Sequence, residues 1–213
     1  MTRGWFITGT DTGVGKTLIS AALIHLLVGS GKRVVGMKPV ASGCHNTAAG
    51  LRSDDAEILI AAANVKVDYA DISPYAFAPA ISPHLAAQEV GVKIELENMF
   101  KHFEILSQQG DAVIVEGVGG WRTPLGQVIT VEHMAKSLGL PVILVVGLKL
   151  GCINHALLTA DAIEAAGLGL AGWVANTIDP TLERTEDIIV TIQKRLTMPL
   201  LGSVPYLEHG DFR

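Results

Sequence analysis

The sequence predicts an α/β fold: a doubly wound, mostly parallel sheet with helices on both faces, formed by residues 1–213 as a single domain. Short apolar runs alternate with longer helical patterns along the chain, which is typical of this class. Residues 142–146 (Val-Ile-Leu-Val-Val) are apolar on both faces, as in parallel strands that are covered on both sides. The length is enough for one large domain with its own core.

The strands are predicted at the apolar runs. We expect them at residues 5–8, 33–38, 112–116, 141–147, 170–175 and 200–204. The carboxyl ends of parallel strands meet at one edge of the sheet, and ligands of such folds bind there.

The helices are predicted between these strands, at residues 16–29, 54–63, 94–109, 131–138, 154–166 and 182–196. The helix at 16–29 is apolar nearly all round, so we expect it to be sandwiched between apolar layers. The helix at 182–196 has one apolar stripe, which includes Ile188, Ile189 and Ile192, and we expect it to lie at the surface.

Composition excludes several classes of protein. The formal net charge is −5, so we expect no broad basic surface for nucleic acid. The longest apolar run, residues 140–148, is too short to span a bilayer, and the N-terminus shows no signal-peptide pattern. Cys44 and Cys152 form no CxxC pair, so neither a disulfide framework nor a zinc site is expected. We therefore expect a cytoplasmic protein with no membrane or nucleic-acid partner.

A glycine-rich loop after the first strand carries the main chemical signal. Residues 5–17 read Trp-Phe-Ile-Thr-Gly-Thr-Asp-Thr-Gly-Val-Gly-Lys-Thr and lead into a helix. Backbone N–H groups of such a loop surround phosphate oxygens, Lys16 adds positive charge, and Thr17 offers a hydroxyl to Mg²⁺. The strict G-x-x-x-x-G-K-[ST] pattern would place glycine at position 10, where this chain has Thr10 after Gly9. The strand before and the helix after it favour a nucleotide site over a chance Gly-Lys-Thr turn. The fold is therefore expected to be P-loop NTPase-like.

Two charged residues end neighbouring strands. Lys38 ends the second strand, where Pro39 keeps it extended, and a lysine there can stabilise transferred negative charge. The alternative for Lys38 is a solvated charge at the sheet rim. Glu116 ends the third strand and is predicted to hold Mg²⁺, directly or through water, unless it is an exposed carboxylate in a turn. The glycines that follow it let the backbone approach a ligand.

Further polar groups lie at other element ends. Asp54 and Asp55 begin a helix after Ser53, so they either cap that helix or supply a second carboxylate to Mg²⁺. The N–H groups at the helix start in residues 150–154 can bind a carboxylate. Asn176 ends the fifth strand, where its amide either recognises a purine edge or caps a turn.

Taken together, these blocks resemble the dethiobiotin synthetase family, which makes a precursor of biotin with ATP. The blocks are residues 9–17, 38–43, 115–121, 141–155 and 171–176, in order along almost the whole chain, and the unusual phosphate loop is the family's own form. The resemblance implies a cyclo-ligase that forms C–N bonds. In the reaction that the resemblance implies, 7,8-diaminononanoate (7,8-diaminopelargonate) would take up CO₂, supplied as bicarbonate, as a carbamate. ATP would convert the carbamate to a carbamic-phosphoric anhydride, and the second amine would close the ring to give dethiobiotin, ADP and phosphate.

The resemblance also implies roles for individual residues. Lys38, Lys16 and Thr12 are implied as catalytic, and Thr17, Asp55 and Glu116 as the ligands of Mg²⁺. The implied ATP contacts are Gly13, Val14, Gly15, Lys16, Thr17, Leu18, Asp55, Glu116, Gly117, Val118, Gly119, Asn176, Thr177, Pro205, Tyr206 and Leu207. The implied substrate contacts are Thr12, Lys38, Ser42, Leu150, Gly151 and Asn154. The family contributes the helix start at 150–154 from the partner subunit, so a homodimer with shared active sites is implied.

One departure and two alternatives accompany this interpretation. Gly13 stands where some relatives carry glutamate, so any direct role of that acid is absent. An amidoligase acting on a corrinoid acid is an alternative, but it needs a glutamine-hydrolysing domain for which this chain has no room. A partition- or septum-site-type switch ATPase is the other, and it usually has an extra lysine where this chain has Thr10, Asp11 and Thr12.

Overall fold

A computed structural model describes residues 4–208 of the protein, and residues 1–3, on which the expectation of no signal peptide partly rests, lie outside this range. Its centre is a six-stranded sheet of order β10-β9-β8-β1-β7-β2, in which every neighbouring pair is parallel. The strands are β1 (Gly4–Gly9), β2 (Val34–Met37), β7 (Ala112–Glu116), β8 (Val142–Leu148), β9 (Leu170–Thr177) and β10 (Leu200–Val204). All six predicted strands are confirmed, with bounds that differ by at most a few residues.

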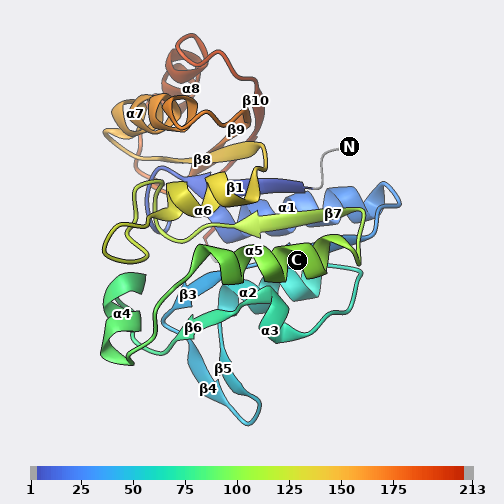
Figure 1. Ribbon diagram of the computed structural model, residues 1–213. Helices are drawn as coiled ribbons and strands as arrows, with labels where there is room; N and C mark the ends of the chain where they lie inside the picture. The colour runs from blue at the N-terminus through green and yellow to red at the C-terminus, as the bar shows by residue number, and fades with distance from the viewer. Residues whose placement is uncertain (1–3, 209–213) are drawn as a thin grey trace.

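Helices cover both faces of this sheet, as predicted (Figure 1). Alternation along β8 assigns the faces, because Ile143 and Val145 belong to one apolar cluster and Leu144 and Val146 to the other. The first cluster is closed by α1 (Lys16–Gly29) and α2 (Asp54–Ala62). The second is closed by α5 (Leu96–Ser107), α6 (Val131–Leu138), α7 (Cys152–Ala165) and α8 (Thr185–Gln193).

The helix α1 differs from its prediction. Ile19, Ala21 and Ile24 are buried against the sheet and α2, but Leu26 is 71% exposed. The expectation that this helix is sandwiched is therefore wrong. The sheet and α2 leave part of the helix open to solvent, and the apolar Leu26 lies there beside His25. By contrast, the predicted stripe of α8 is confirmed, because Ile192 is buried and Ile188 and Ile189 pack on the same cluster.

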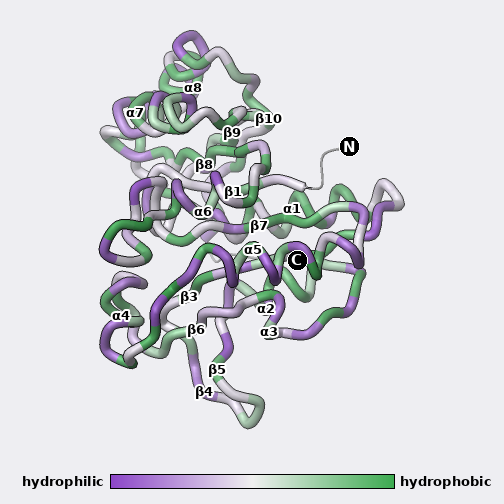
Figure 2. Tube along the Cα trace, viewed as in Figure 1, coloured by the Kyte–Doolittle hydropathy of each residue, from purple (hydrophilic) through white to green (hydrophobic). Residues whose placement is uncertain are grey.

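The segment between β2 and α5 contains elements that the sequence did not predict. It holds a parallel pair of strands, an antiparallel hairpin and two short helices: β3 (Val40–Ser42), β4 (His45–Thr47), β5 (Gly50–Arg52), α3 (Tyr69–Ile72), β6 (Tyr75–Phe77) and α4 (Pro83–Glu89). Three-residue strands are too short to show a hydrophobic period. The β4–β5 hairpin projects from the body, and its strands are mostly polar, whereas β7 and α1 run through apolar segments (Figure 2).

The order of the strands places one loop at the centre of the sheet edge. From β1 the chain goes to β2 and β7 on one side, and afterwards to β8, β9 and β10 on the other. The loop after β1 therefore lies at the switch point between β7 and β8, where ligands of doubly wound sheets bind. The chain changes from one side of β1 to the other in the connection from β7 to β8.

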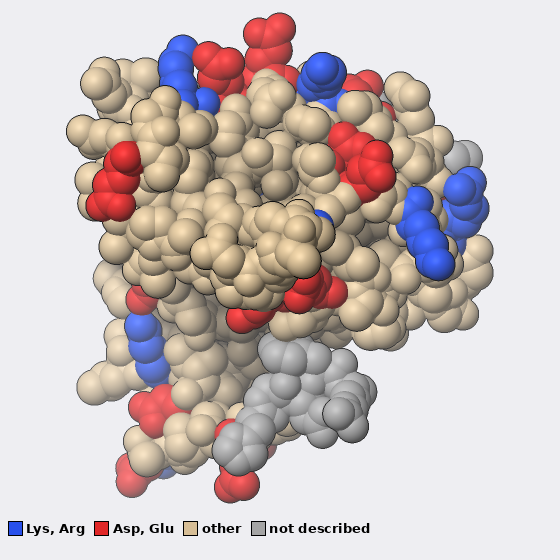
Figure 3. All heavy atoms as spheres, turned by 90° about the horizontal axis from the view of Figure 1, so that it is seen from below, with Lys and Arg blue, Asp and Glu red and all other residues tan. Residues whose placement is uncertain are grey.

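The surface and the remaining helices bear on the other predictions. On the face shown in Figure 3, acidic and basic side chains form small separate groups between uncharged areas. Within residues 4–208, no helix has the length and apolar character that crossing a membrane requires. Cys44 and Cys152 are both buried and unpaired.

Candidate active site

The loop between β1 and α1 has the backbone of a phosphate loop. Gly13 and Gly15 have φ values of 72° and 89°, in the left-handed region that side chains with a Cβ avoid. Gly15 is also tightly enclosed, because a Cβ there would lie 2.2 Å from Nδ2 of Asn176. That same Nδ2 donates a hydrogen bond of 2.9 Å to the carbonyl of Val14. Asn176, from the end of β9, thus fixes the tip of the loop.

Lys16 is buried inside this loop. Its Nζ donates to the main-chain oxygen of Asp11 at 2.9 Å, and the residue is 7% exposed. Burial, together with the positive charge of Lys38, lowers the pKa of Lys16 from 10.5 to about 8. The ammonium is therefore charged at neutral pH and poorly compensated, which favours binding of an anion.

Lys38 joins two carboxylates from different elements. Its Nζ lies 2.6 Å from Oε1 of Glu116 and 2.7 Å from Oδ2 of Asp55, and it also donates to the carbonyl of Gly117 at 3.1 Å. Lys38 is 3% exposed and Glu116 is 1% exposed. Both alternatives from the sequence, a solvated rim lysine and an exposed turn carboxylate, are therefore wrong.

The charges in this group support one another. Burial opposes the ammonium form of Lys38, but the carboxylates of Glu116 and Asp55 outweigh it and raise the pKa of Lys38. Burial also opposes the charge of Asp55, yet Lys38 and the Thr17 hydroxyl lower the pKa of Asp55. Lys38 thus remains positive and Asp55 negative at neutral pH.

Three oxygen donors converge beside Lys16. The Thr17 hydroxyl lies 2.9 Å from Oδ1 of Asp55 and 3.0 Å from Oε1 of Glu116, but its single proton can serve only one of them at a time. Oε2 of Glu116 is buried and has no hydrogen-bond partner among residues 4–208. Hard oxygen donors with an unsatisfied buried acceptor fit a Mg²⁺ ion.

The start of α2 separates its two aspartates. Ser53 is the cap, because its hydroxyl accepts from the backbone N–H of Ala56 at 3.4 Å. Asp54 is exposed and pairs with His45, whereas Asp55 turns toward Lys38. The structure therefore distinguishes the two neighbours, which the sequence left open.

An ion pair beside the loop was missed by the sequence reasoning. Nζ of Lys149, just after β8, lies 2.9 Å from Oδ2 of Asp11, and the backbone N–H of Thr12 donates to Oδ1 of Asp11 at 2.8 Å. Asp11 and Lys149 are 138 positions apart, so no local pattern links them. Only their shared position at strand ends of one sheet edge could have suggested the contact.

Other predicted ATP contacts lie around this cluster. Leu18 is in the first turn of α1, Gly117 is buried directly after Glu116, and Gly119 has a φ of 61°. Val118 is partly buried between those two glycines, and Thr177 ends β9 next to Asn176.

The remaining predicted residues are not brought together with the lysines. Ser42 ends β3, Gly151 precedes α7 with a φ of 91°, and Asn154 is exposed on that helix. Among residues 4–208, no hydrogen bond or ion pair joins Ser42, Leu150, Gly151, Asn154, Pro205, Tyr206 or Leu207 to Lys16 or Lys38. Leu150 is 90% exposed, and the segment 205–207 lies exposed after β10.

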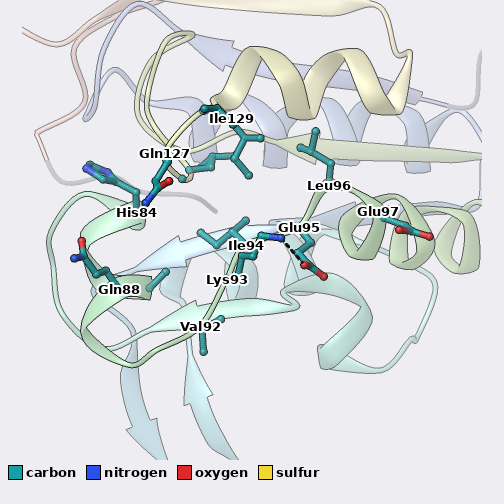
Figure 4. A pocket seen from close by; sticks show the side chains of 14 residues that line it. His84, Gln88, Val92, Lys93, Ile94, Glu95, Leu96, Glu97, Gln127 and Ile129 are labelled. Carbon is teal, nitrogen blue, oxygen red and sulfur yellow. Dashed lines mark hydrogen bonds and ion pairs between the residues drawn. The ribbon is translucent and has the colours of Figure 1, made fainter.

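A cavity of about 820 Å³ lies elsewhere, between the segment that joins α4 to α5 and residues 125–129 (Figure 4). Apolar side chains such as Ile94 and Ile129 line it, with His84 and Gln127 among its polar groups and a Lys93–Glu95 ion pair of 3.1 Å. None of the residues predicted for ATP, metal or substrate lines this cavity.

Sequence comparison gives close relatives over the full chain. A family model described as AAA domain matches residues 3–211. A protein of Xanthomonas euvesicatoria pv. vesicatoria (strain 85-10) named ATP-dependent dethiobiotin synthetase BioD is 50% identical over 207 residues, which are 97% of this chain and 92% of that protein. A protein of the same name from Nitrosospira multiformis is 49% identical over 213 residues, covering 100% of this chain and 92% of that protein.

Structural comparison gives more distant proteins. A ParA family ATPase from Chlorobium tepidum TLS has a TM-score of 0.57 at 18% identity and covers 97% of this chain and 86% of its own. The MinC:MinD cell division protein complex of Aquifex aeolicus gives a TM-score of 0.60 at 19% identity, covering 97% of this chain and 82% of that one. At such identities the likeness concerns the fold alone, and it confirms the P-loop NTPase-like class.

Proposed function

The chain belongs to the family of ATP-dependent dethiobiotin synthetases, and on that premise we propose that it converts 7,8-diaminononanoate and CO₂ to dethiobiotin at the expense of ATP. The observation that carries this proposal is the buried group of Lys38, Glu116 and Asp55 beside the phosphate loop. A buried ammonium held next to a nucleotide site suits a reaction in which negative charge develops on a carbamate and on a phosphoryl group.

The proposed reaction has three bond-forming steps. One unprotonated amine of the substrate adds to the carbon of CO₂, loses a proton to solvent and becomes a carbamate. A carbamate oxygen then forms a bond to the γ-phosphorus while the bond to the β,γ-bridging oxygen breaks and ADP leaves. Finally the second amine attacks the carbamate carbon, loses a proton, and expels phosphate as the cyclic urea closes. The protein's contribution is chiefly position and charge.

The proposed reaction gives separate roles to Lys16, Lys38 and Thr12. Lys16 and the N–H groups of the loop would bind the terminal phosphates. The ammonium of Lys16 bonds the main-chain oxygen of Asp11, and phosphate oxygens would add negatively charged partners to it. Lys38 would stabilise charge on the carbamate and the γ-phosphoryl group, and the two carboxylates keep it protonated for that purpose. Thr12, exposed at the loop, is proposed to contact both the diamine and the phosphate region.

Thr17, Asp55 and Glu116 would hold the metal. Mg²⁺, when bound, neutralises phosphate charge and orients the γ-phosphoryl group. The three oxygen donors and the unpartnered Oε2 of Glu116 support this assignment. Asn176 is proposed to contact adenine with the part of its amide that does not bond Val14, and residues 205–207 to line the base.

We further propose a homodimer with shared active sites. The helix start at Leu150, Gly151 and Asn154 would then bind the substrate carboxylate of the partner subunit, and Ser42 would contact the diamine. The exposure of Leu150 and the start of α7, where the cap residue Gly151 makes no side-chain cap, support this arrangement. The two unpaired cysteines suit a reducing cytoplasm, where we expect the enzyme to act.

The test is ADP release from the purified protein with ATP, Mg²⁺ and bicarbonate, with and without 7,8-diaminononanoate, together with mass detection of dethiobiotin. We expect ADP release to depend on the diamine and to match the dethiobiotin formed. ADP release that ignores the diamine, without product, would contradict the proposal. Stimulation by DNA or lipid vesicles instead would favour a switch ATPase.

A further inference from the structure

We propose that Lys149 is a positioning residue for nucleotide binding, because it holds and neutralises the carboxylate of Asp11 inside the phosphate loop. The pair joins the end of β8 to the loop after β1, with Nζ of Lys149 at 2.9 Å from Oδ2 of Asp11. Lys149 acts through Asp11 in this proposal and makes no contact with the nucleotide. The inference rests on the proposed use of ATP, but not on the proposed second substrate.

Asp11 organises the first half of the loop through three contacts. Its Oδ2 accepts from Lys149, its Oδ1 accepts from the N–H of Thr12 at 2.8 Å, and its main-chain oxygen accepts from Lys16 at 2.9 Å. The Asp11 carboxylate therefore fixes the N–H of Thr12, while the main-chain oxygen of the same residue holds the loop lysine. Turning this side chain would release the N–H of Thr12, in the part of the loop that is proposed to receive phosphate.

The end of β8 is also tied to the loop just before Asp11. The N–H of Thr10 donates to the carbonyl of Val145 at 3.0 Å, and the N–H of Gly147 donates to the Thr10 hydroxyl at 3.4 Å. Lys149 adds a charged contact one residue further along the loop. The phosphate loop is thus held from β8 on one side and by Asn176 of β9 at its tip.

The ion pair of Lys149 with Asp11 should affect the binding of an anionic ligand, because it neutralises a carboxylate in the phosphate loop. The hydrogen bond from Lys149, followed by that from Thr12, lowers the pKa of Asp11, so its carboxylate stays ionised at neutral pH. An unneutralised carboxylate in a loop that receives a polyphosphate would repel it. The side chains of Lys149 and Asp11 are 36% and 47% exposed, and such pairs contribute little to stability. We therefore expect the pair to affect ligand affinity more than folding.

The experiment measures the affinity of a non-hydrolysable ATP analogue with Mg²⁺ by calorimetry, for Lys149→Met, Asp11→Asn and the double variant. Lys149→Met should weaken binding on the order of tenfold, because Asp11 then faces the phosphates unpaired. Asp11→Asn should have a smaller effect, because Asn can still accept from Thr12. The double variant should bind like Asp11→Asn alone. Lys149→Arg should restore most of the affinity.

Two results would overturn the proposal. Losses that add up in the double variant would mean that Lys149 contacts the nucleotide itself, and an unchanged affinity of Lys149→Met would mean that the pair is without effect. Lys93→Met, which removes the exposed pair with Glu95 elsewhere, is the matched control and should leave affinity unchanged. The affinity measurement does not require formation of dethiobiotin. It therefore tests the role of Lys149 whether or not the synthetase reaction is found. The midpoint of thermal unfolding should shift little in all variants.

Discussion

Nζ of Lys38 lies 2.6 Å from Oε1 of Glu116, and both side chains are almost completely buried. The register of the sheet produces this contact, because Met37 of β2 is paired with Val115 of β7, and the residue that follows each of them along the chain is one partner of the ion pair. Asp55, from α2, completes the group. The backbone register therefore brings these charged side chains together at one edge of the sheet. Removing one of the charges leaves another without its partner.

Replacing Lys38 should abolish ring closure while nucleotide binding remains. Lys38→Met removes the charge proposed to stabilise the carbamate and the γ-phosphoryl group, so kcat for dethiobiotin should fall by about 100-fold or more. ADP and dethiobiotin are measured together with ATP-analogue affinity, and the exposed Lys101→Met is the control. Near-normal product formation would remove Lys38 from the mechanism.

The same substitution has a cost in stability. Glu116 would be left as a buried, uncompensated charge, which costs about 3–5 kcal/mol in comparable cases. The double variant Lys38→Met with Glu116→Gln should recover much of that stability without recovering activity. A double variant that regains ring closure would argue against the assigned role of Lys38.

Replacing Glu116 should raise the Mg²⁺ concentration that the enzyme needs for activity. Glu116→Gln keeps the shape of the side chain but removes its charge, so the Mg²⁺ concentration for half-maximal activity should rise, on the order of tenfold. The measurement is a Mg²⁺ titration of ADP formation at saturating ATP, with the exposed Glu97→Gln as control. An unchanged titration curve would argue against Glu116 as a ligand.

Nucleotide affinity should depend on pH through Lys16. Without nucleotide its pKa is about 8, and phosphate charge favours the ammonium, so binding must raise this pKa. Affinity should therefore be constant below pH 8 and fall above it, by up to about tenfold per pH unit. Calorimetry at pH 8.5–9 in buffers of different ionisation enthalpy should detect proton uptake on binding. Lys16→Arg, which stays charged, should show neither the decline nor the uptake.

A methyl group at Gly15 should disrupt the loop more than the same change at a comparable glycine. Gly15 and Gly31 have similar φ values, 89° and 84°, so Ala is strained at both by about 1–2 kcal/mol. Only at Gly15 does the new Cβ meet a neighbour, Nδ2 of Asn176 at 2.2 Å, whereas nothing lies within 4 Å at Gly31. Gly15→Ala should lose ATP-analogue binding, and Gly31→Ala should keep it. Equal affinities would contradict the tight contact at the loop tip.

Most of the fold could be predicted from the sequence because its signals are local. Runs such as residues 142–146 are apolar on both faces, and this property is typical of a strand that is covered on two sides. The strands β3, β4, β5 and β6 escaped prediction because they have three residues each, too few for a period. The exposure of Leu26 on α1 escaped it because the number of neighbours of a helix is a property of the whole fold.

The sequence by itself determined the chemistry that each strand end carries: the loop with Lys16 and Thr17, the lysine at 38 and the acid at 116. Only the tertiary structure decided that Asp55 rather than Asp54 meets Lys38, that Asn176 bonds the loop at Val14, and that Lys149 pairs with Asp11. The physical reason is separation along the chain. Hydrophobic pattern and turn residues act over a few positions, whereas these contacts join residues that only the parallel sheet brings to one edge.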